Sequence, residues 1–241
     1  MSSLNVSIHK LSINESMSGK EDNLESCFII LSGRCRVEII EDKKSVYEEV
    51  GQRDSVFNGK ATAVYIPIKT YYKISAMSER LEIVQISAYA NDKMQAFVVK
   101  PDEIVSEVRG NEIWKRRVDS IVDSKKMTNG LIIGETVHLG GWSGYPPHKH
   151  DIDNYPWELA QSEVYFIKIE PTSGFGIFVN YKEEVSTAEL TILQDESQVF
   201  VKNGYHCVVS SPGCQFYYLW ALAHKEREVV YSVDKKYIDE E

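Results

Sequence analysis

Short segments in which apolar and polar residues alternate run along most of this chain. Residues 34–40 and 81–88 show the alternation in the first half, and residues 131–139 repeat it in the second. A period of two is typical of strands that bury one face. Asn58-Gly59 and Asn129-Gly130 are turn pairs beside such segments. The pattern predicts an all-β fold of antiparallel strands, either a sandwich or a barrel.

The middle of the chain interrupts this strand pattern. Residues 91–110 contain Pro101, several acids and Gly110, which is typical of a linker with one short helical turn. The chain is therefore expected to divide into a first domain at residues 1–100 and a second at residues 108–234. Near the end of the second domain, Pro212-Gly213 is expected to turn the last β-hairpin.

Candidate metal ligands gather in the second half. His148 and His150 are two positions apart, so a strand would point both imidazoles to the same face. Glu163 opens the next apolar segment, and His206 follows the turn pair Asn203-Gly204. Imidazole nitrogen and carboxylate oxygen suit divalent Zn, Fe, Mn or Ni. The spacing predicts one metal on these four side chains; the alternative is that they are unrelated polar residues.

The two halves resemble each other weakly, as duplicated domains would. Val64–Ile74 can be laid on Val199–Val209, which places Tyr71 where His206 stands. The first half has a single histidine, His9. We therefore expect the first domain to lack the metal site of the second.

Composition narrows the class of protein. The chain has 241 residues, of which 43% are hydrophobic, enough for one large or two small domains. Its formal net charge is -9, and the basic run Lys115–Arg117 is interpreted as a solvated face, so no nucleic-acid partner is expected. No apolar run reaches the roughly 20 residues of a membrane span. Met1–Lys20 has no signal-peptide core, and the four cysteines form no C-x-x-C motif, which favours a cytoplasmic protein without a membrane partner.

The residues around the candidate ligands also carry a family resemblance. The segment WSGYPPHKHD at residues 142–151, EVY at 163–165 and GYH at 204–206 resemble the bicupin uronate isomerase family. That family includes 5-deoxy-glucuronate isomerase of inositol catabolism and 5-keto-4-deoxyuronate isomerase. The resemblance implies a bicupin, two antiparallel jelly-roll barrels in tandem. It also implies one divalent metal, most often zinc, with Mn or Fe as alternatives, in the second barrel.

The chain departs from the family pattern beside this site. The family's Gln-Arg pair falls on Phe178 and Val179. Losing an arginine removes a bidentate clamp for a substrate carboxylate. The identity of the substrate is therefore open.

No general base stands out from the sequence. Tyr145, Glu158 and Tyr218 are weak catalytic candidates, although an exposed loop acid is the simpler interpretation of Glu158 and core packing that of the tyrosines. Side chains that could contact the substrate are, by the same reasoning, Tyr145, Lys149, Tyr205 and Tyr218.

Three functions fit these observations. The favoured one is a metal-dependent aldose–ketose isomerase acting on a small-molecule sugar acid, and a homo-oligomer is compatible with it. A cupin-type oxygenase would need a redox metal, and the same ligands would serve it. A non-catalytic sugar-binding bicupin would explain the missing Gln-Arg pair.

Overall fold

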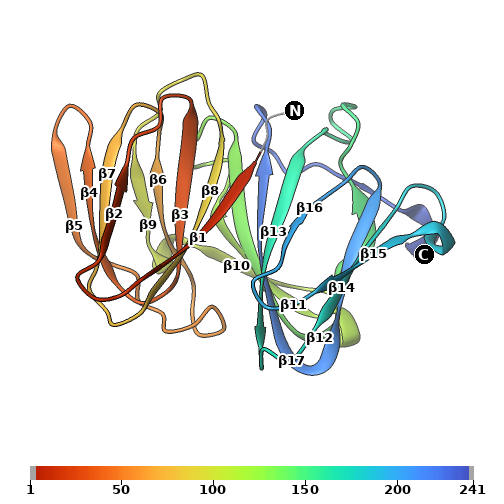
Figure 1. Cartoon of the computed structure of the whole chain (residues 1–241). Coiled ribbons are helices and arrows are strands. Elements are labelled where there is room, and N and C mark those ends of the chain that lie inside the picture. Colours follow the sequence, from red (N-terminus) through yellow and green to blue (C-terminus); the bar gives the residue numbers. More distant parts are fainter. Residues whose placement is uncertain (1–3, 239–241) are drawn as a thin grey trace.

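The computed structural model describes residues 4–238 and confirms the all-β fold. The described chain forms strands and four short 3₁₀ turns, η1 (Pro101–Glu103), η2 (Glu112–Trp114), η3 (Val185–Thr187) and η4 (Lys235–Tyr237). Two β units lie side by side, the first drawn in red to yellow and the second in green to blue (Figure 1). No helix within residues 4–238 has the length and apolar character needed to cross a membrane.

Two antiparallel sheets make up the first unit. One has the order β1-β8-β3-β6-β9 and the other β2-β7-β4-β5. Their facing sides enclose a core that contains Phe28, Ile74 and Leu81. The strands are β1 (Asn5–Leu11), β2 (Ser16–Gly19), β3 (Leu24–Ser32), β4 (Cys35–Ile40), β5 (Lys44–Val50), β6 (Thr62–Ile66), β7 (Tyr71–Ala76), β8 (Leu81–Tyr89) and β9 (Phe97–Val99).

The second unit is built around two long paired strands, β12 and β17. The main path of its sheet has the order β10-β11-β12-β17-β13-β16, and β14 joins β17 to β15. The strands are β10 (Val105–Arg109), β11 (Arg116–Val122), β12 (Leu131–Lys149), β13 (Ser162–Glu170), β14 (Gly176–Tyr181), β15 (Glu189–Leu193), β16 (Gln198–Phe200), β17 (Tyr205–Ala223) and β18 (Ser232–Val233). Strand β9 belongs to a sheet of the first unit and β10 to the sheet of the second, so the chain passes from one unit to the other between them. The expected domain limits, residues 1–100 and 108–234, stay a prediction.

Two irregularities bend the β12–β17 pair. Along β12 the register moves from Leu139↔Gln215 to Gly141↔Ser210, so the extra residues lie on β17. They include Pro212-Gly213, and the expected hairpin there is wrong: the pair forms a bulge inside one strand. Further on, the register moves from Ser143↔Val208 to His148↔His206, so the extra residues now lie on β12. Bulges of this kind re-aim the side chains that follow them, here those of the candidate ligands.

The alignment of the two halves does not extend to Tyr71. Tyr71 opens β7 and is 38% exposed, whereas His206 near the start of β17 is fully buried. The neighbouring Tyr72 takes the inward position and packs against Phe28. Strand alternation explains the difference, because a shift of one residue reverses the face.

Buried polar contacts hold the two units together. Glu25 accepts hydrogen bonds from the backbone N–H groups of residues 129–131, at 2.7, 2.8 and 3.1 Å, and from the Tyr65 hydroxyl at 2.6 Å. Arg53 donates to both oxygens of Glu135 at 2.7 and 2.9 Å. One apolar cluster is also shared by the two units. The second unit is therefore supported by the first along the side where β12 begins.

Candidate metal centre

A buried group of two histidines and one carboxylate lies inside the second unit. His150 follows the end of β12, Glu163 stands near the start of β13 and His206 near the start of β17. Glu163 Oε2 is 2.9 Å from His150 Nε2 and 3.3 Å from His206 Nε2. One ligand atom from each residue lies within 4.8 Å of the others, a spacing that can hold a metal ion.

Hydrogen bonds at the Nδ1 atoms of His150 and His206 fix which ring nitrogen faces Glu163. His150 Nδ1 is 3.0 Å from the carbonyl oxygen of Gln161, and His206 Nδ1 is 3.4 Å from that of Gly204. A carbonyl only accepts, so each Nδ1 carries the proton and each Nε2 of a neutral ring presents a lone pair. Both lone pairs then face the Glu163 carboxylate, and His206 Nε2 is buried without a hydrogen-bond partner among the described residues. A cation between these three acceptors would satisfy all of them, so the donor set fits a metal.

His148, the fourth predicted ligand, lies beside this group. Its ring centroid is 4.5 Å from that of His206, and the two residues are direct partners in the β12–β17 register. Its Nδ1 is 3.1 Å from the carbonyl oxygen of Gly144. The Nε2 lone pair is thus available in the same way, although His148 falls outside the compact group formed by the other three.

The protonation states agree with this arrangement. Burial, and after it the charge of His206, lowers the pKa of His148 to about 3, so this ring is neutral. Burial would raise the pKa of Glu163, but its close contacts with His150 and His206 outweigh it and hold that pKa well below its ordinary range. Burial would lower the pKa of His150, but the bond to Glu163 raises it.

Three of the four candidate ligands, His148, His150 and Glu163, line a cavity of about 190 Å³, whereas the fully buried His206 is not part of its lining. Tyr165 and Tyr218 both line the cavity, with their ring centroids 5.0 Å apart. The Tyr218 hydroxyl is 2.7 Å from Ser143 Oγ. Burial, and next to it the charge of Glu163, raises the pKa of Tyr165 well above its ordinary value, and burial also raises the pKa of Tyr218. Both phenols therefore stay protonated and can donate hydrogen bonds into the cavity.

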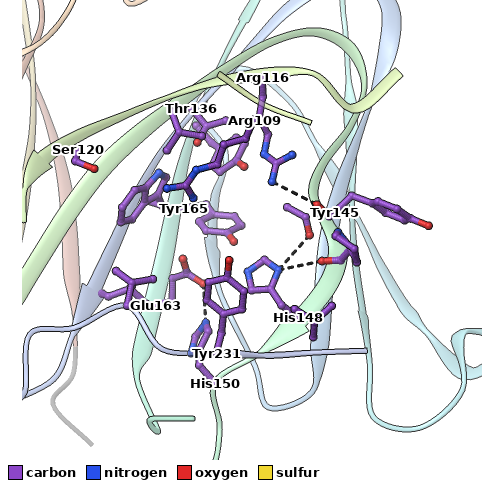
Figure 2. Close-up of a pocket in the computed structure, with 18 residues that line it drawn as sticks. Arg109, Arg116, Ser120, Thr136, Tyr145, His148, His150, Glu163, Tyr165 and Tyr231 are labelled. Atoms are coloured by element: carbon purple, nitrogen blue, oxygen red, sulfur yellow. Dashed lines mark hydrogen bonds and ion pairs between the residues drawn. The ribbon is translucent and has the colours of Figure 1, made fainter. Parts of the chain in front are cut away.

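Two arginines that were not predicted as site residues line the same cavity. Arg109 ends β10 and Arg116 begins β11, and both side chains enter the cavity from the side opposite His150 and Glu163 (Figure 2). The interpretation of Lys115–Arg117 as a solvated face is wrong for Arg116. Arg117 also departs from it, because its Nε lies 3.1 Å from the buried carboxylate of Asp119. Successive side chains of a strand point to opposite faces of the sheet, so Arg116 and Arg117 of β11 face different sides.

A segment near the C-terminus crosses the cavity. Val229, Tyr231 and Val233 line it, and the Tyr231 ring lies 4.8 Å from the ring of His148. Strand β18 pairs with the end of β12, and the backbone N–H of Asp234 donates to the carbonyl of Pro147 at 2.8 Å. We call residues 228–234 the strap. Its sequence has no distinctive motif. It is held at the site by pairing with β12 and by hydrogen bonds from Leu159 and Gln161 to the carbonyls of Val230 and Glu228.

The other predicted site residues lie around the cavity with different contacts. The Tyr145 ring points away from the cavity (Figure 2) and packs near Trp114 and Trp142. Lys149 and Tyr205 are outside the lining: Lys149 Nζ lies 5.9 Å from the Tyr205 ring. Of the four side chains expected to contact a substrate, Tyr218 is therefore the one whose ring belongs to the cavity wall.

Glu158 is not the exposed loop acid that was expected. It is 4% exposed and accepts hydrogen bonds from the backbone N–H groups of Asp151 and Ile152 at 2.9 and 3.0 Å. Lys149 donates to the same Glu158 oxygen at 3.1 Å and to Asp151 at 2.8 Å. These contacts fix the loop that follows His150, which makes Glu158 a structural residue of the site.

Phe178 and Val179 occupy the positions of the absent Gln-Arg pair. The Phe178 ring is buried, 5.9 Å from the ring of His206 and nearly parallel to it, at 24°. Val179 belongs to another apolar cluster, together with Cys207. Phe178 therefore covers His206 with an apolar ring, and β14 offers no cation to a substrate at these two positions.

The fold and the site together define a bicupin with a candidate metal centre in its second barrel. A mutant of oxalate decarboxylase from Bacillus subtilis shares this fold, with a TM-score of 0.66 over 96% of this chain and 71% of that chain at 12% identity. An IolB-like protein from Salmonella typhimurium is more similar, with a TM-score of 0.91 over 97% of this chain and 88% of that chain at 27% identity.

The sequence comparisons place the chain in a family. The model of the KduI/IolB family matches residues 1–239. The 5-deoxy-glucuronate isomerase of Geobacillus kaustophilus is 31% identical over 90% of this chain and 78% of that protein. The 5-deoxy-glucuronate isomerase of Bacillus subtilis strain 168 is 33% identical over 85% of this chain and 75% of that protein. The chain belongs to the KduI/IolB family, which confirms the resemblance found in the sequence and the expectation of an enzyme of the sugar-isomerase class.

Proposed function

We propose that this protein is a metal-dependent aldose–ketose isomerase that acts on a sugar acid, with 5-deoxy-glucuronate as the first substrate to test. The observation that carries the proposal is the buried group of His150, Glu163 and His206. Its nitrogen lone pairs and its carboxylate converge, and two of its members, His150 and Glu163, line one end of the cavity. Membership of a family whose named relatives are 5-deoxy-glucuronate isomerases supports the choice of reaction.

Zinc is the proposed metal, held by these three residues and by His148. Three imidazole nitrogens and one carboxylate oxygen suit it, and Mn or Fe fits the same donors. When bound, such an ion polarises the sugar carbonyl and stabilises the negative charge that develops as the neighbouring carbon loses its proton. Backbone carbonyls hold the tautomers of all three histidines, since each Nδ1 bonds outward.

The wall of the cavity orients the sugar. Tyr165 and Tyr218 remain neutral phenols, since the pKa of each is raised, and donate hydrogen bonds to hydroxyl or carbonyl oxygens of the sugar. The contact of Tyr218 with Ser143 fixes its hydroxyl. The strap limits the entry of water from the other side, with Tyr231 over the ring of His148. Exclusion of water strengthens each polar contact inside the site.

The proposal is tested by following isomerisation directly. The purified protein is stripped with a chelator, reloaded with Zn²⁺, Mn²⁺ or Fe²⁺, and incubated with 5-deoxy-glucuronate, D-glucuronate and D-galacturonate while NMR follows aldehyde loss and ketone formation. We expect turnover that disappears on stripping and returns on reloading. A protein with one metal per chain that isomerises no uronate would contradict the proposal, and oxygen consumption with the iron form would point to an oxygenase.

A further inference from the structure

Two arginines from neighbouring strands face each other at the end of the cavity away from the metal ligands. Arg109 of β10 and Arg116 of β11 are direct partners in the antiparallel register, so their side chains leave the same face of the sheet. Both line the cavity that contains the candidate ligands, and both reach into it from the same side (Figure 2). Like charges directly opposite each other destabilise a sheet pair unless something compensates them.

The neighbouring groups compensate this charge only in part. Arg109 bonds through Nε and Nη2 to the Glu107 carboxylate at 3.0 and 2.8 Å. Arg116 donates to two backbone carbonyls, those of Trp114 at 3.2 Å and Tyr145 at 3.3 Å, and lies 5.6 Å from the Trp114 ring. Within residues 4–238, no carboxylate lies within ion-pair distance of Arg116. A guanidinium has five N–H donors, so both side chains keep donors for a ligand.

We infer that Arg109 and Arg116 form the subsite for the carboxylate of the sugar acid. The inference rests on the proposed function and specifies which end of the substrate lies where. In a hexuronate the carbonyl and the carboxylate are at opposite ends of the carbon chain. The cavity has imidazoles and a carboxylate at one end and two guanidinium groups at the other. The carbonyl end therefore lies at His148 and His150, which line the cavity, and the carboxylate at the arginines.

This subsite also accounts for the substitutions on β14. Phe178 and Val179 offer no cation on the β14 side of the cavity, because one packs on His206 and the other lies in an apolar cluster. The β10–β11 pair supplies positive charge from the opposite sheet edge instead. Arginine is suited to the role because its planar fork matches a carboxylate in a bidentate contact. Selection of an acidic sugar over a neutral one then depends on two residues outside the group of metal ligands.

The test compares three sugars on the zinc-loaded protein. Isothermal titration measures the binding of D-glucuronate, of D-glucose as its neutral counterpart, and of D-glucose 6-phosphate as a sugar whose anion is a phosphate. The variants are Arg116→Gln, Arg109→Gln and Arg116→Lys, and the matched control is Lys115→Gln, which removes one positive charge at an exposed neighbouring position. Zinc content is measured on every variant, so that loss of metal is separated from loss of the anion contact.

We expect Arg116→Gln and Arg109→Gln each to weaken glucuronate binding by roughly 10- to 100-fold, the range for a hydrogen-bonded charged group, while glucose binding stays unchanged. The glucuronate affinity of Arg116→Lys should lie between those of Arg116→Gln and the parent, and Lys115→Gln should bind glucuronate like the parent. Equal weakening of both sugars, no change in either, or a preference for glucose 6-phosphate overturns the inference. If the arginine variants turn over uronate like the parent, the subsite is wrong and the proposed function stands. If glucuronate binding depends on the arginines but no turnover is seen, the subsite stands and the proposed function is wrong.

Discussion

Arg53 and Glu135 form a bidentate ion pair between the two β units, with side-chain exposures of 3% and 0%. Arg53 stands between β5 and β6, and Glu135 lies on β12 next to Thr136, which lines the cavity. The Arg53 guanidinium also lies 6.0 Å from the ring of Tyr217. The first unit, which contributes no residue to the candidate ligands, thus fixes the strand that carries Thr136 and His148.

This pair predicts a large effect on stability. Arg53→Met leaves the Glu135 carboxylate buried without its partner, and we expect a loss of about 3–5 kcal/mol in the free energy of unfolding, measured by urea denaturation. The double variant Arg53→Met/Glu135→Leu removes both charges and should recover most of that loss. The matched control is Arg36→Met, whose surface pairs with Glu38 and Glu48 are screened by solvent, so we expect a much smaller loss. A double variant no more stable than the single one would show that packing, not charge burial, sets the cost.

Metal content decides the role of each candidate ligand. His150→Ala and His206→Ala each remove a candidate ligand, and Glu163→Gln removes the negative charge that offsets the cation. We expect metal affinity to fall by at least roughly 10- to 100-fold, the range for residues that only hydrogen-bond to a metal ligand. Mass spectrometry of the purified variants measures metal per chain. His224→Ala serves as the control, since His224 lies in the segment after β17 and is not part of the group.

His148→Ala tests the fourth position separately. We expect a loss of metal as well, because burial lowers the pKa of this ring, which is neutral, and its outer nitrogen is held by Gly144. Full metal content in this variant would make the site one of three protein ligands and assign His148 to the cavity wall.

His138 makes stability depend on pH. Burial lowers its pKa from 6.5 to about 4, so the folded protein resists a proton that the unfolded chain accepts. The stabilising contribution is therefore complete above pH 6.5 and is lost as the pH falls toward 4. Between about pH 7 and pH 5 we expect this residue to account for about 2 kcal/mol of the decrease in unfolding free energy.

Comparing His138→Phe with the parent protein isolates the contribution of His138 to the pH dependence of the unfolding free energy. The replacement keeps a ring beside Phe216, whose centroid is 5.3 Å from that of His138. Urea denaturation of both metal-free proteins at about pH 7 and pH 5 should show a smaller pH dependence in the variant. Parallel losses in the two proteins would mean that other groups cause the decrease.

Tyr231 on the strap tests closure of the cavity. Tyr231→Ala removes the ring that covers His148, and we expect kcat/KM to fall by about 2- to 10-fold with metal content unchanged, the range for an aromatic contact. Tyr231→Phe keeps the ring and should retain most of the activity. If both variants lose activity equally, the hydroxyl rather than the ring is what the reaction needs.

Local pattern is enough to predict the strands and the candidate ligands. A strand that buries one face alternates apolar and polar side chains, and this alternation can be read from consecutive residues, as in residues 81–88. The ligands are predictable because His148 and His150 are close in sequence and Glu163 and His206 begin later strands. Their convergence on one point needs only that β12, β13 and β17 be neighbours.

Register and long-range pairing are not visible in the local pattern. Arg116 belongs to a charged run in the sequence, and only the β10–β11 alignment shows that its partner is Arg109. Glu158 is buried rather than exposed because backbone amides fold back onto its carboxylate. Pro212-Gly213 is a turn pair by composition, yet the surrounding pairing with β12 makes it a bulge.

The pairing of β12 with β17 also bears on how the site is assembled in a cell. Leu131 pairs with Ala223 and His148 with His206, so the ligands meet only after distant parts of the chain have come together. Such non-local contacts form slowly, and here they are held by an apolar core and a buried ion pair that need no metal. We expect newly made protein to reach its full shape empty and to be loaded afterwards. The supply of metal would then set how much of the protein is active, while the amount that is folded stays the same.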